Sequence, residues 1–547
     1  MKVMLSTTPM NRPGGDYNFH LKGARPSTGM VYLGSMLGEQ GKFGFGRLTG
    51  VDVMLEEPNI SEGRFLKSLN KFGPDIFCFT PYEFNLERSK ELCALVKALN
   101  PNTLVFVGGP LATIAPEYVG KFIHADAVFL GEADFTLREV VNYLTRGGRL
   151  EKIDVAGVLP MKKGKPIETA NSRKIQTLTQ AEYRMIEPDI GLLAEVTKNA
   201  GYEKMDFAFS RGCPSKLICS FCQLPATGNK ALETGKIIGI LKQIKQIPGI
   251  KFMCFGDAMF GNGKDGAIRL MKEITREGIS FDGFAAEWSL DMLLKAGEKG
   301  KREADLEMLN LMKQLHIGGE IGLESLSESQ LVKFNKDNYT YEEIKRVLSA
   351  VKDQGIITSS GIFLWGFDTT CKEVIETIER AFDLAHSLRR VPITFIDGPV
   401  PYMGTVEYAK FMEARKNGGE EFEAALVLMN EYGLVKKTSS RDYPVTLKAP
   451  MPLQDMLLQQ AIVEMSKMTE KMSFEGREYP PLGLFQMDGD GDEAHLLTML
   501  LAIKKVASEG KYPQSKEVLE MANRALDSIG KNKVAGLLAD IIESDLC

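Results

Sequence analysis

The sequence predicts an α/β protein with four parts: a Rossmann-like domain at residues 1–150, a linker at 151–200, a partial (β/α)6 barrel at 201–415 and a helical domain at 416–547. Short apolar runs alternate with helical stretches in the first and third parts, as expected for parallel sheets covered by helices. In the last part, apolar residues recur at helical spacing instead. A chain of 547 residues is also long enough for about three domains.

Five apolar runs in the first part are predicted strands, and glycine turns follow the last two of them. The strands are expected at residues 2–6, 51–55, 75–79, 103–107 and 127–130. Helices are expected at residues 29–39, 62–71, 86–99, 116–122 and 135–144. This alternation predicts a doubly wound sheet, on which a ligand binds beyond the carboxyl ends of the strands.

The same alternation returns in the third part with six predicted strands. They are expected at residues 207–210, 251–255, 281–287, 318–323, 356–365 and 391–396. The intervening helices are expected at residues 234–247, 264–276, 306–314, 341–354 and 371–388. In barrels built this way, chemistry gathers at the carboxyl ends of the strands.

The linker and the last part carry fewer signals. The linker is expected to form short strands and turns, with residues 162–166 as a hairpin tip, and to take no part in chemistry. Helices are expected in the last part at residues 453–472, 494–506, 516–528 and 533–542. A helical C-terminal domain is therefore predicted.

Composition and charge exclude several classes of function. The formal net charge is −5 at pH 7, so no basic surface for nucleic acid is indicated. No apolar run reaches the roughly 18 residues of a membrane span, and the first residues, Met1–Leu5, do not resemble a signal peptide. Eight cysteines without an export signal are typical of a reducing compartment, so a cytoplasmic location is expected.

Three cysteines within ten residues, Cys213, Cys219 and Cys222, form the most informative motif of the chain. Three thiolates at such spacing can hold three irons of a [4Fe-4S] cluster and leave the fourth iron open to a small molecule. A zinc site is the alternative, but it requires a fourth ligand nearby, and the next cysteine is Cys254. A disulfide is a weaker alternative, because nothing marks the chain as secreted.

The residues around these cysteines resemble the radical S-adenosylmethionine (SAM) enzymes. The matching segments are Ser210–Arg211–Gly212–Cys213–Pro214 and Cys219–Ser220–Phe221–Cys222, with an aromatic residue before the last cysteine. The family usually has three residues between the first two cysteines, and this chain has five. The resemblance implies that SAM binds the open iron of an oxygen-sensitive cluster, which suits an oxygen-poor cell.

The first domain resembles the cobalamin-binding domain that is joined to many radical SAM enzymes. The resemblance lies in the loop and helix at residues 26–34 and in the glycine turns after the fourth and fifth strands, where glycine permits close backbone approach. It implies cofactor contacts from Thr28, Gly29, Tyr82, Glu83, Gly108, Gly109, Pro110, Gly131 and Glu132. A flavodoxin-like domain with another ligand, or with none, is the alternative.

The histidine motif that ligates cobalt in some cobalamin proteins, Asp-x-His-x-x-Gly, is absent. The histidines of the chain all lie in other contexts: His20, His124, His316, His386 and His495. The resemblance therefore implies base-off cobalamin without a histidine ligand. Residues 80–85, which include Tyr82 and Glu83, would lie beside its lower face.

Residues at the predicted strand ends of the barrel resemble the SAM-binding segments of the family. Asp257 corresponds to a polar segment near the SAM amino group, and Glu324 and Ser325 to residues facing the ribose or methionine portion. Gly366 belongs to a glycine turn that packs near adenine. For an acidic residue at a strand end, a cap on the next helix is the alternative role.

Two further residues are candidates for the catalytic centre. Glu287 ends a predicted strand and would bond SAM or the substrate. Tyr402 lies in a segment that resembles the closing loop of the family and would reach the substrate or cobalamin. Both assignments follow from the resemblance.

The resemblance as a whole implies a methyltransferase that acts on an unactivated carbon of a small molecule or protein side chain. A 5′-deoxyadenosyl radical would remove a hydrogen atom and methylcobalamin would supply the methyl group, because cofactors carry such chemistry. Two alternatives stay open: rearrangement or cyclisation without methyl transfer, and a non-catalytic protein that binds cobalamin or an iron–sulfur cluster. An external donor such as ferredoxin or flavodoxin is implied, and methyl-coenzyme M reductase is one candidate substrate. Neither nucleic acid nor a membrane is expected as a partner.

Overall fold

The computed structural model separates into two compact units, formed by residues 1–214 with 224–286 and by residues 215–223 with 287–547. We describe each unit by itself. The residues that the structure describes are 1–7, 28–37, 48, 50–56, 62–82, 85–200, 203–215, 218–223, 229–297, 300–336, 338–364, 366–388, 393–396, 403–413, 415–417, 490–530 and short segments between 435 and 486.

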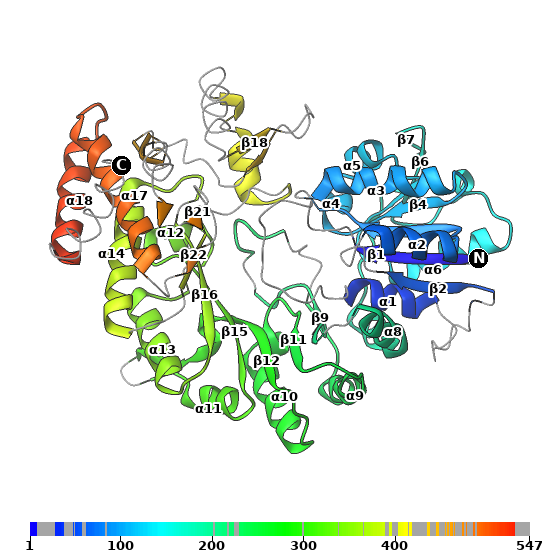
Figure 1. The fold of residues 1–547 in the computed structure, drawn as a ribbon, viewed down its shortest axis with the longest axis horizontal. Helices are drawn as coiled ribbons and strands as arrows, with labels where there is room; N and C mark the ends of the chain where they lie inside the picture. Colours follow the sequence, from blue (N-terminus) through cyan, green and yellow to red (C-terminus); the bar gives the residue numbers. More distant parts are fainter. Residues whose placement is uncertain are drawn as a thin grey trace. The chain divides into compact units, whose positions relative to one another are not determined.

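The first unit begins with a sheet in the order β2-β1-β3-β4-β5-β6-β7 (Figure 1). Its strands are β1 (Lys2–Thr7), β2 (Asp52–Glu56), β3 (Ile76–Thr80), β4 (Leu104–Val107), β5 (Ala127–Phe129), β6 (Val158–Lys162) and β7 (Lys165–Pro166). The pairs among β1 to β5 are parallel, whereas β6 pairs antiparallel with both β5 and β7. The five predicted parallel strands are therefore confirmed.

Helices cover both faces of this sheet, as the apolar runs predicted. They are α1 (Thr28–Leu37), α2 (Glu62–Phe72), α3 (Leu86–Leu99), α4 (Pro110–Ile114), α5 (Pro116–Ile123) and α6 (Asp134–Thr145). Val3 and Leu5 of β1 are buried in one core with residues of α1 and α6. Phe77 of β3 packs instead against Phe65 of α2, with ring centroids 6.0 Å apart. Successive strand residues point to opposite faces, so both faces bury apolar side chains.

The carboxyl ends of the parallel strands lie at one edge of the sheet. Thr7 pairs with Thr80, Phe79 with Val107, and Val107 with Val128, so β1, β3, β4 and β5 end in register. The loops that follow these strands therefore meet at one edge, which is where ligands of doubly wound sheets bind.

The first part of the predicted linker extends this sheet by two strands, β6 and β7. The hairpin β6–β7 turns at Lys163 and Gly164, which both have left-handed φ values, 50° and 73°. This confirms the hairpin expected at residues 162–166. Two helices follow, α7 (Gln180–Met185) and α8 (Ile190–Ala200), and the prediction of short strands and turns did not include them.

The first unit ends with the start of the second β/α series. Its elements are β8 (Lys204–Phe207), β9 (Ser210–Arg211), β10 (Lys230–Ala231), α9 (Thr234–Lys245), β11 (Phe252–Phe255), α10 (Lys264–Arg276) and β12 (Gly283–Ser289). β8, β11 and β12 pair in parallel, and the short strands β9 and β10 form an antiparallel pair. Along the chain, β12 passes from the first unit into the second after Ala286.

The second unit continues the series with three more parallel strands and their helices. The elements are β13 (Leu294–Ala296), β14 (Arg302–Ala304), α11 (Leu306–Gln314), β15 (Ile317–Glu324), α12 (Glu328–Lys333), α13 (Tyr341–Asp353), β16 (Thr358–Phe363), α14 (Cys371–Leu388) and β17 (Ile393–Ile396). β15, β16 and β17 pair in parallel. Each of the six strands predicted for the barrel thus has a counterpart among the described residues.

Among the described residues, the C-terminal part of the second unit holds several short strands followed by two helices. The helices α17 (Asp490–Ser508) and α18 (Ser515–Ile529) pack against each other and against α14 (Figure 1). The strands are β18 (Val435–Lys437), β19 (Val445–Leu447), β20 (Ser473–Phe474), β21 (Arg477–Glu478) and β22 (Phe485–Gln486). β22 pairs antiparallel with β17, so a strand from the C-terminal part joins the edge of the parallel sheet. The helix predicted at 533–542 lies outside the described residues.

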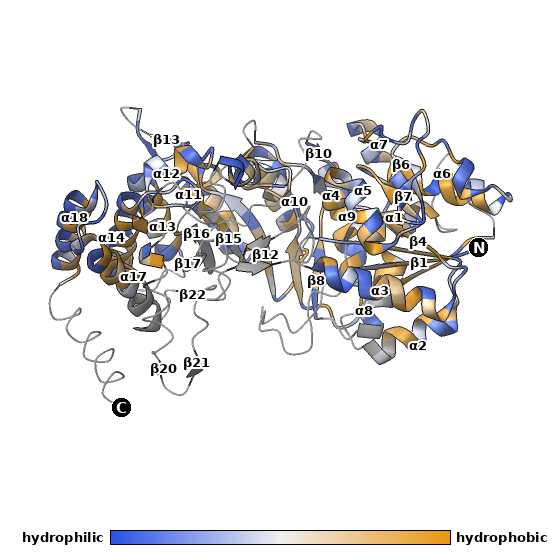
Figure 2. Cartoon of the chain, turned by 90° about the horizontal axis from the view of Figure 1, so that it is seen from above, coloured by the Kyte–Doolittle hydropathy of each residue, from blue (hydrophilic) through white to orange (hydrophobic). Residues whose placement is uncertain are grey.

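Figure 2 shows hydrophilic and hydrophobic residues on the same helix, for example on α18 and on α3. Within the described part of the chain, no helix combines the length and the apolar character that a membrane crossing would require.

Candidate active site

The three motif cysteines differ in exposure from the rest. Cys213, Cys219 and Cys222 are partly exposed, whereas the other described cysteines are buried: Cys78, Cys93, Cys254 and Cys371. A cysteine that binds metal must present its sulfur, while a buried cysteine behaves as a small apolar side chain. Cys213 belongs to the first unit, and Cys219 and Cys222 to the second. Among the described residues no set of three Cys, His, Asp or Glu side chains is arranged to hold a metal ion, so the cluster site remains a prediction.

The loop that carries Cys219 and Cys222 is held by backbone bonds in the second unit. The Cys222 amide donates to the Cys219 carbonyl at 3.0 Å, which closes a turn between the two sulfurs. The amide of Ser220 donates to the carbonyl of Phe334 at 3.1 Å. The side-chain amide of Asn335 donates to the Ile218 carbonyl at 3.0 Å. These bonds fix the direction of the turn independently of any ligand.

An aromatic cluster supports the same turn. The ring of Phe221 lies 4.9 Å from that of Phe363 and 5.7 Å from that of Phe334, in edge-to-face arrangements. Such pairs stabilise by about 0.5–1.5 kcal/mol beyond burial. Phe363 ends β16 and Phe334 follows α12, so the residue before the last cysteine is packed at a carboxyl end of the parallel strands.

Asp257 follows β11 and organises the chain before Cys213. Its Oδ1 accepts hydrogen bonds from the amides of Phe209 and Ser210, at 2.7 and 2.6 Å, and from the Ser210 hydroxyl at 2.8 Å. Burial raises the pKa of Asp257 to about 6, although these hydrogen bonds favour the charged form. The carboxylate therefore holds backbone in place, and a contact with the SAM amino group stays a prediction.

The glycines after β4 and β5 are required by their own surroundings. Gly109 has a φ of 96°, and a Cβ there would lie 2.4 Å from Thr80 Cγ2. Gly131 has a φ of 85°, and a Cβ there would lie 2.0 Å from the Gln176 carbonyl oxygen. The Gly131 amide donates a hydrogen bond to Thr113 Oγ1 at 2.8 Å. Gly108 directly follows β4, and Pro110 begins α4 at the position that proline favours.

Four of the remaining residues predicted to bind cobalamin, Thr28, Gly29, Tyr82 and Glu132, lie in segments that follow β1, β3 and β5 in the chain. Thr28 and Gly29 begin α1, and Gly29 is exposed. Tyr82 follows β3, and its amide donates to Asn85 Oδ1 at 2.8 Å. Glu83 lies outside the described residues. Glu132 is engaged by the chain itself: its Oε2 lies 3.0 Å from Lys230 Nζ and accepts from the Leu178 amide at 2.7 Å.

Glu324 lies at a bulge in β15. The register between β15 and β16 shifts between Gly322 and Glu324, and Glu324 has a left-handed φ of 63°. A non-glycine residue with this conformation is uncommon and marks a functional or strained position. Its Oε1 lies 3.2 Å from Lys336 Nζ, and both side chains are largely buried. Glu287, in β12, is exposed, and Tyr402 lies outside the described residues.

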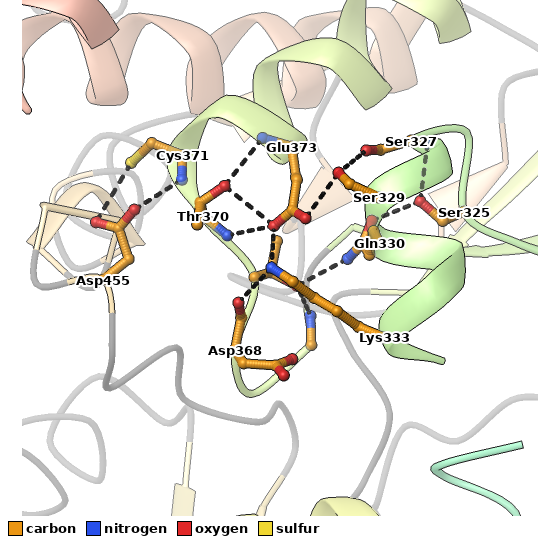
Figure 3. Close-up of polar contacts among 12 residues, drawn as sticks. Ser325, Ser327, Ser329, Gln330, Lys333, Asp368, Thr370, Cys371, Glu373 and Asp455 are labelled. Carbon is orange, nitrogen blue, oxygen red and sulfur yellow. Dashed lines mark hydrogen bonds and ion pairs between the residues drawn. The ribbon is translucent and has the colours of Figure 1, made fainter. Parts of the chain in front are cut away.

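A buried hydrogen-bond chain joins Ser325 to Gly366 through Gln330 and Thr369, and Figure 3 shows Ser325 and Gln330 at its start. The Ser325 hydroxyl donates to Gln330 Oε1 at 2.5 Å, and Gln330 Nε2 donates to Thr369 Oγ1 at 2.9 Å. Thr369 Oγ1 also accepts from the Gly366 amide at 2.6 Å. The loop after β15 and the loop after β16 are therefore linked by one glutamine. The Ser325 hydroxyl points to Gln330, and its contact with SAM remains a prediction.

A second part of the network surrounds the start of α14 (Figure 3). Glu373 Oε2 accepts from the Thr370 amide at 2.8 Å and lies 2.6 Å from Lys333 Nζ, while its Oε1 accepts from the Ser329 hydroxyl at 2.8 Å. Sequence reasoning missed this arrangement, although Thr370-x-x-Glu373 is a capping-box pattern that announces a helix start. Glu373 therefore has a structural role, because it connects α12 to α14.

Two family models match the chain over separate stretches. The B12 binding domain matches residues 18–141, and the radical SAM superfamily matches residues 207–385. The chain thus pairs a B12-binding domain with a radical SAM domain, which is the domain composition of the cobalamin-dependent radical SAM enzymes. The resemblance stated from the sequence is confirmed.

Individual proteins resemble the chain as well. An uncharacterized methyltransferase from Pyrococcus horikoshii is 26% identical over 386 residues, covering 70% of this chain and 77% of that protein. The anaerobic magnesium-protoporphyrin IX monomethyl ester cyclase of Rubrivivax gelatinosus is 22% identical over 391 residues, covering 67% of this chain and 64% of the cyclase. The solved structure of the cobalamin-dependent SAM radical enzyme OxsB with aqua-cobalamin bound is similar with a TM-score of 0.61 and 14% identity, covering 100% of this chain and 80% of OxsB. At that identity the similarity is one of fold.

Proposed function

We propose that the chain is a cobalamin-dependent radical SAM methyltransferase that methylates an unactivated carbon of a small molecule or a protein side chain. The observation that carries the proposal is the partial exposure of Cys213, Cys219 and Cys222 in a chain whose other described cysteines are buried. The methyltransferase name of the Pyrococcus horikoshii relative supports the choice of reaction.

The residues present fit the proposed cofactors. Cys213, Cys219 and Cys222 would hold the cluster, since three thiolates leave one iron open. Gly109 and Gly131 lie in the loops after β4 and β5, at the sheet edge where ligands of doubly wound sheets bind. When bound, the cluster and SAM supply a 5′-deoxyadenosyl radical, and cobalamin supplies the methyl group. The chain itself would hold the reactants close together and exclude water.

The absence of the Asp-x-His-x-x-Gly motif supports cobalamin without a histidine ligand, and His20 lies outside the described residues. His124 follows α5 and precedes β5, which places it toward the amino ends of the parallel strands, opposite the edge formed by the glycine loops. We therefore propose base-off cobalamin. An electron paramagnetic resonance spectrum of the cobalt(II) form with nitrogen splitting would contradict this assignment.

Cyclisation without methyl transfer is a second candidate, favoured by the similarity to the Rubrivivax gelatinosus cyclase. The two candidates share the radical step and differ in the fate of the methyl group. A methyltransferase transfers it to the substrate, whereas a cyclase does not. For either reaction we propose an external electron donor, such as ferredoxin or flavodoxin, and a cytoplasmic location.

The test uses protein purified and reconstituted without oxygen. Iron, sulfide and cobalamin are quantified, and the protein is then incubated with a reductant, SAM carrying a deuterated methyl group and an extract of the producing cells. We expect 5′-deoxyadenosine and a product that carries the deuterated methyl group. Purified methyl-coenzyme M reductase is one defined protein substrate for the same assay. Deoxyadenosine without labelled product would favour cyclisation, and the absence of iron and sulfide would contradict both candidates.

A matched pair of variants separates the motif from a general effect of losing a thiol. Cys222→Ala is expected to abolish deoxyadenosine formation, because the cluster would lose one ligand. Cys254→Ala removes a buried cysteine of β11 that lies outside the motif, and it should retain deoxyadenosine formation. Equal activity of the two variants would show that Cys222 is not a ligand.

A further inference from the structure

Arg211 lies two residues before Cys213, in the short strand β9, and its side chain reaches the first domain. Its Nη1 lies 2.6 Å from Asp134 Oδ2, and its Nη2 lies 2.8 Å from Asp134 Oδ1, which makes a two-pronged pair. Nη1 also lies 3.2 Å from Glu132 Oε1. A two-pronged pair fixes direction as well as distance, because the guanidinium and carboxylate planes must align.

Two tyrosines enclose the same guanidinium. Its carbon lies 5.1 Å from the ring centroid of Tyr32 in α1 and 5.1 Å from that of Tyr183 in α7. Both tyrosines are buried, and the Tyr32 hydroxyl donates to the Ala208 carbonyl at 3.2 Å. An arginine held over ring faces within about 6 Å is attracted by their negative potential. The side chain of Arg211 is therefore restrained from two sides.

The charges around Arg211 are balanced within the first unit. Lys230 pairs with Arg211 across the β9–β10 ladder, where two cations would repel each other. Glu132 and Asp134 supply two carboxylates, and Lys230 Nζ lies 3.0 Å from Glu132 Oε2. Asp134 is 2% exposed. A buried ion pair is weak evidence for stability. Its better-supported role is to fix a single arrangement of the chain.

The contacts of Arg211 join three segments of the chain. In the proposed function, these segments bind two different cofactors. α1 and the loop after β5 belong to the edge assigned to cobalamin, while Arg211 leads directly into the first cysteine. A ligand that orders one of these segments lowers the cost of ordering the others, which is positive coupling between two sites.

We propose that Arg211 is a positioning residue that couples cobalamin binding to assembly of the iron–sulfur site. This inference rests on the cofactors of the proposed function. Cobalamin binds more tightly when the iron–sulfur cluster is present. This difference in affinity depends on the two-pronged contact between the Arg211 guanidinium and Asp134. If the role of Arg211 were purely structural, its substitution would change the cobalamin affinity of the cluster-free and the cluster-loaded protein equally. If Arg211 couples the two sites, its substitution changes the ratio of these two affinities.

The experiment measures the affinity for hydroxocobalamin by absorbance titration, with and without the cluster, in the full chain under anaerobic conditions. In the wild-type protein we expect the cluster-loaded form to bind about tenfold more tightly, within the usual range of coupling between sites. Arg211→Lys keeps the charge and loses the fork, so the ratio should fall to about twofold or less. Tyr183→Leu removes one ring without leaving a charge unpaired, and it should give an intermediate ratio even if the arginine variant folds poorly.

Arg173 provides the matched control. It also contacts two carboxylates of the first unit, those of Glu117 and Glu168, but its side chain is 49% exposed. Arg173→Lys should leave the tenfold ratio unchanged. A wild-type ratio near one, or an unchanged ratio in Arg211→Lys, would overturn the inference. If the ratio behaves as expected and no labelled methyl product forms, the coupling stands and the proposed methyl transfer fails.

Discussion

Gln330 offers a direct test of the network at the ends of β15 and β16. Gln330→Leu replaces the side chain by an apolar one of similar length and removes both of its bonds, to Ser325 and to Thr369. Ser325, Gln330 and Thr369 are all 0% exposed, so water does not replace the missing partner. The Ser325 hydroxyl then has a proton and no acceptor.

The size of the effect follows from these bonds. A stranded buried hydroxyl costs about 1–3 kcal/mol, and the lost bond to Thr369 adds about 1 kcal/mol. We therefore expect the free energy of unfolding of the second unit to fall by about 2–4 kcal/mol. The assay is urea unfolding of the cofactor-free protein followed by tryptophan fluorescence, for which Trp288 is a buried reporter in the same unit.

Two comparisons isolate the role of the glutamine. Gln314→Leu, at the exposed end of α11, should change the free energy of unfolding by less than about 0.5 kcal/mol. Gln330→Glu keeps an acceptor for Ser325 and regains a donor toward Thr369 only when protonated, so its stability should approach the wild-type value at low pH. If Gln330→Leu stays within about 0.5 kcal/mol of the wild type, the chain does not hold the two loops.

Three further predictions concern the first unit and the cysteine motif. Gly131→Ala should lower the free energy of unfolding by more than about 2 kcal/mol, because its Cβ would meet the Gln176 carbonyl; Gly147→Ala, also at positive φ but with open space, should cost about 1 kcal/mol, and equal losses would contradict the clash. Asp257 has a raised pKa of about 6, so its contribution to stability is present below its ordinary pKa and is lost as pH rises through about 6; relative to Asp257→Asn, urea unfolding should show a loss of about 3 kcal/mol between acid and neutral pH, and parallel pH profiles would refute this. In the cofactor-free protein, a maleimide should label Cys213, Cys219 and Cys222 before any buried cysteine, and mass spectrometry showing early labelling of Cys254 would contradict the exposure pattern.

The fold was largely predictable because its signals are local. The strand predicted at residues 75–79 contains the apolar run Ile76–Phe79 and is observed as Ile76–Thr80, and the helix at residues 86–99 begins and ends as predicted, because each signal lies within one window of sequence. The short helix α12 was missed, since six residues give little periodicity, and the hairpin of β13 and β14 was missed as well. The helices of the linker were overlooked because turn residues dominate that stretch.

The site was predictable only in part, because its contacts join distant residues. The cysteines were found from their spacing, and their exposure agrees with a ligand role. The partner of Arg211 lies 77 residues away, and the bond from Gln330 to Thr369 spans 39 residues, so no local pattern announces them. Ser325 was assigned by resemblance to a ligand, and the structure gives its hydroxyl to Gln330. Resemblance identifies a segment, but only packing decides where a side chain points.

The uneven burial of the thiols has a consequence for the life of the protein before it is loaded. Air oxidation proceeds through the accessible thiolate, first to sulfenic acid and then to forms that are not readily reversed. Among the described cysteines, the accessible sulfurs are the three that the proposed metallocentre needs, while the buried ones are dispensable for it. Oxidation would therefore modify the three motif cysteines first. Newly made chains would depend on prompt delivery of iron and sulfide.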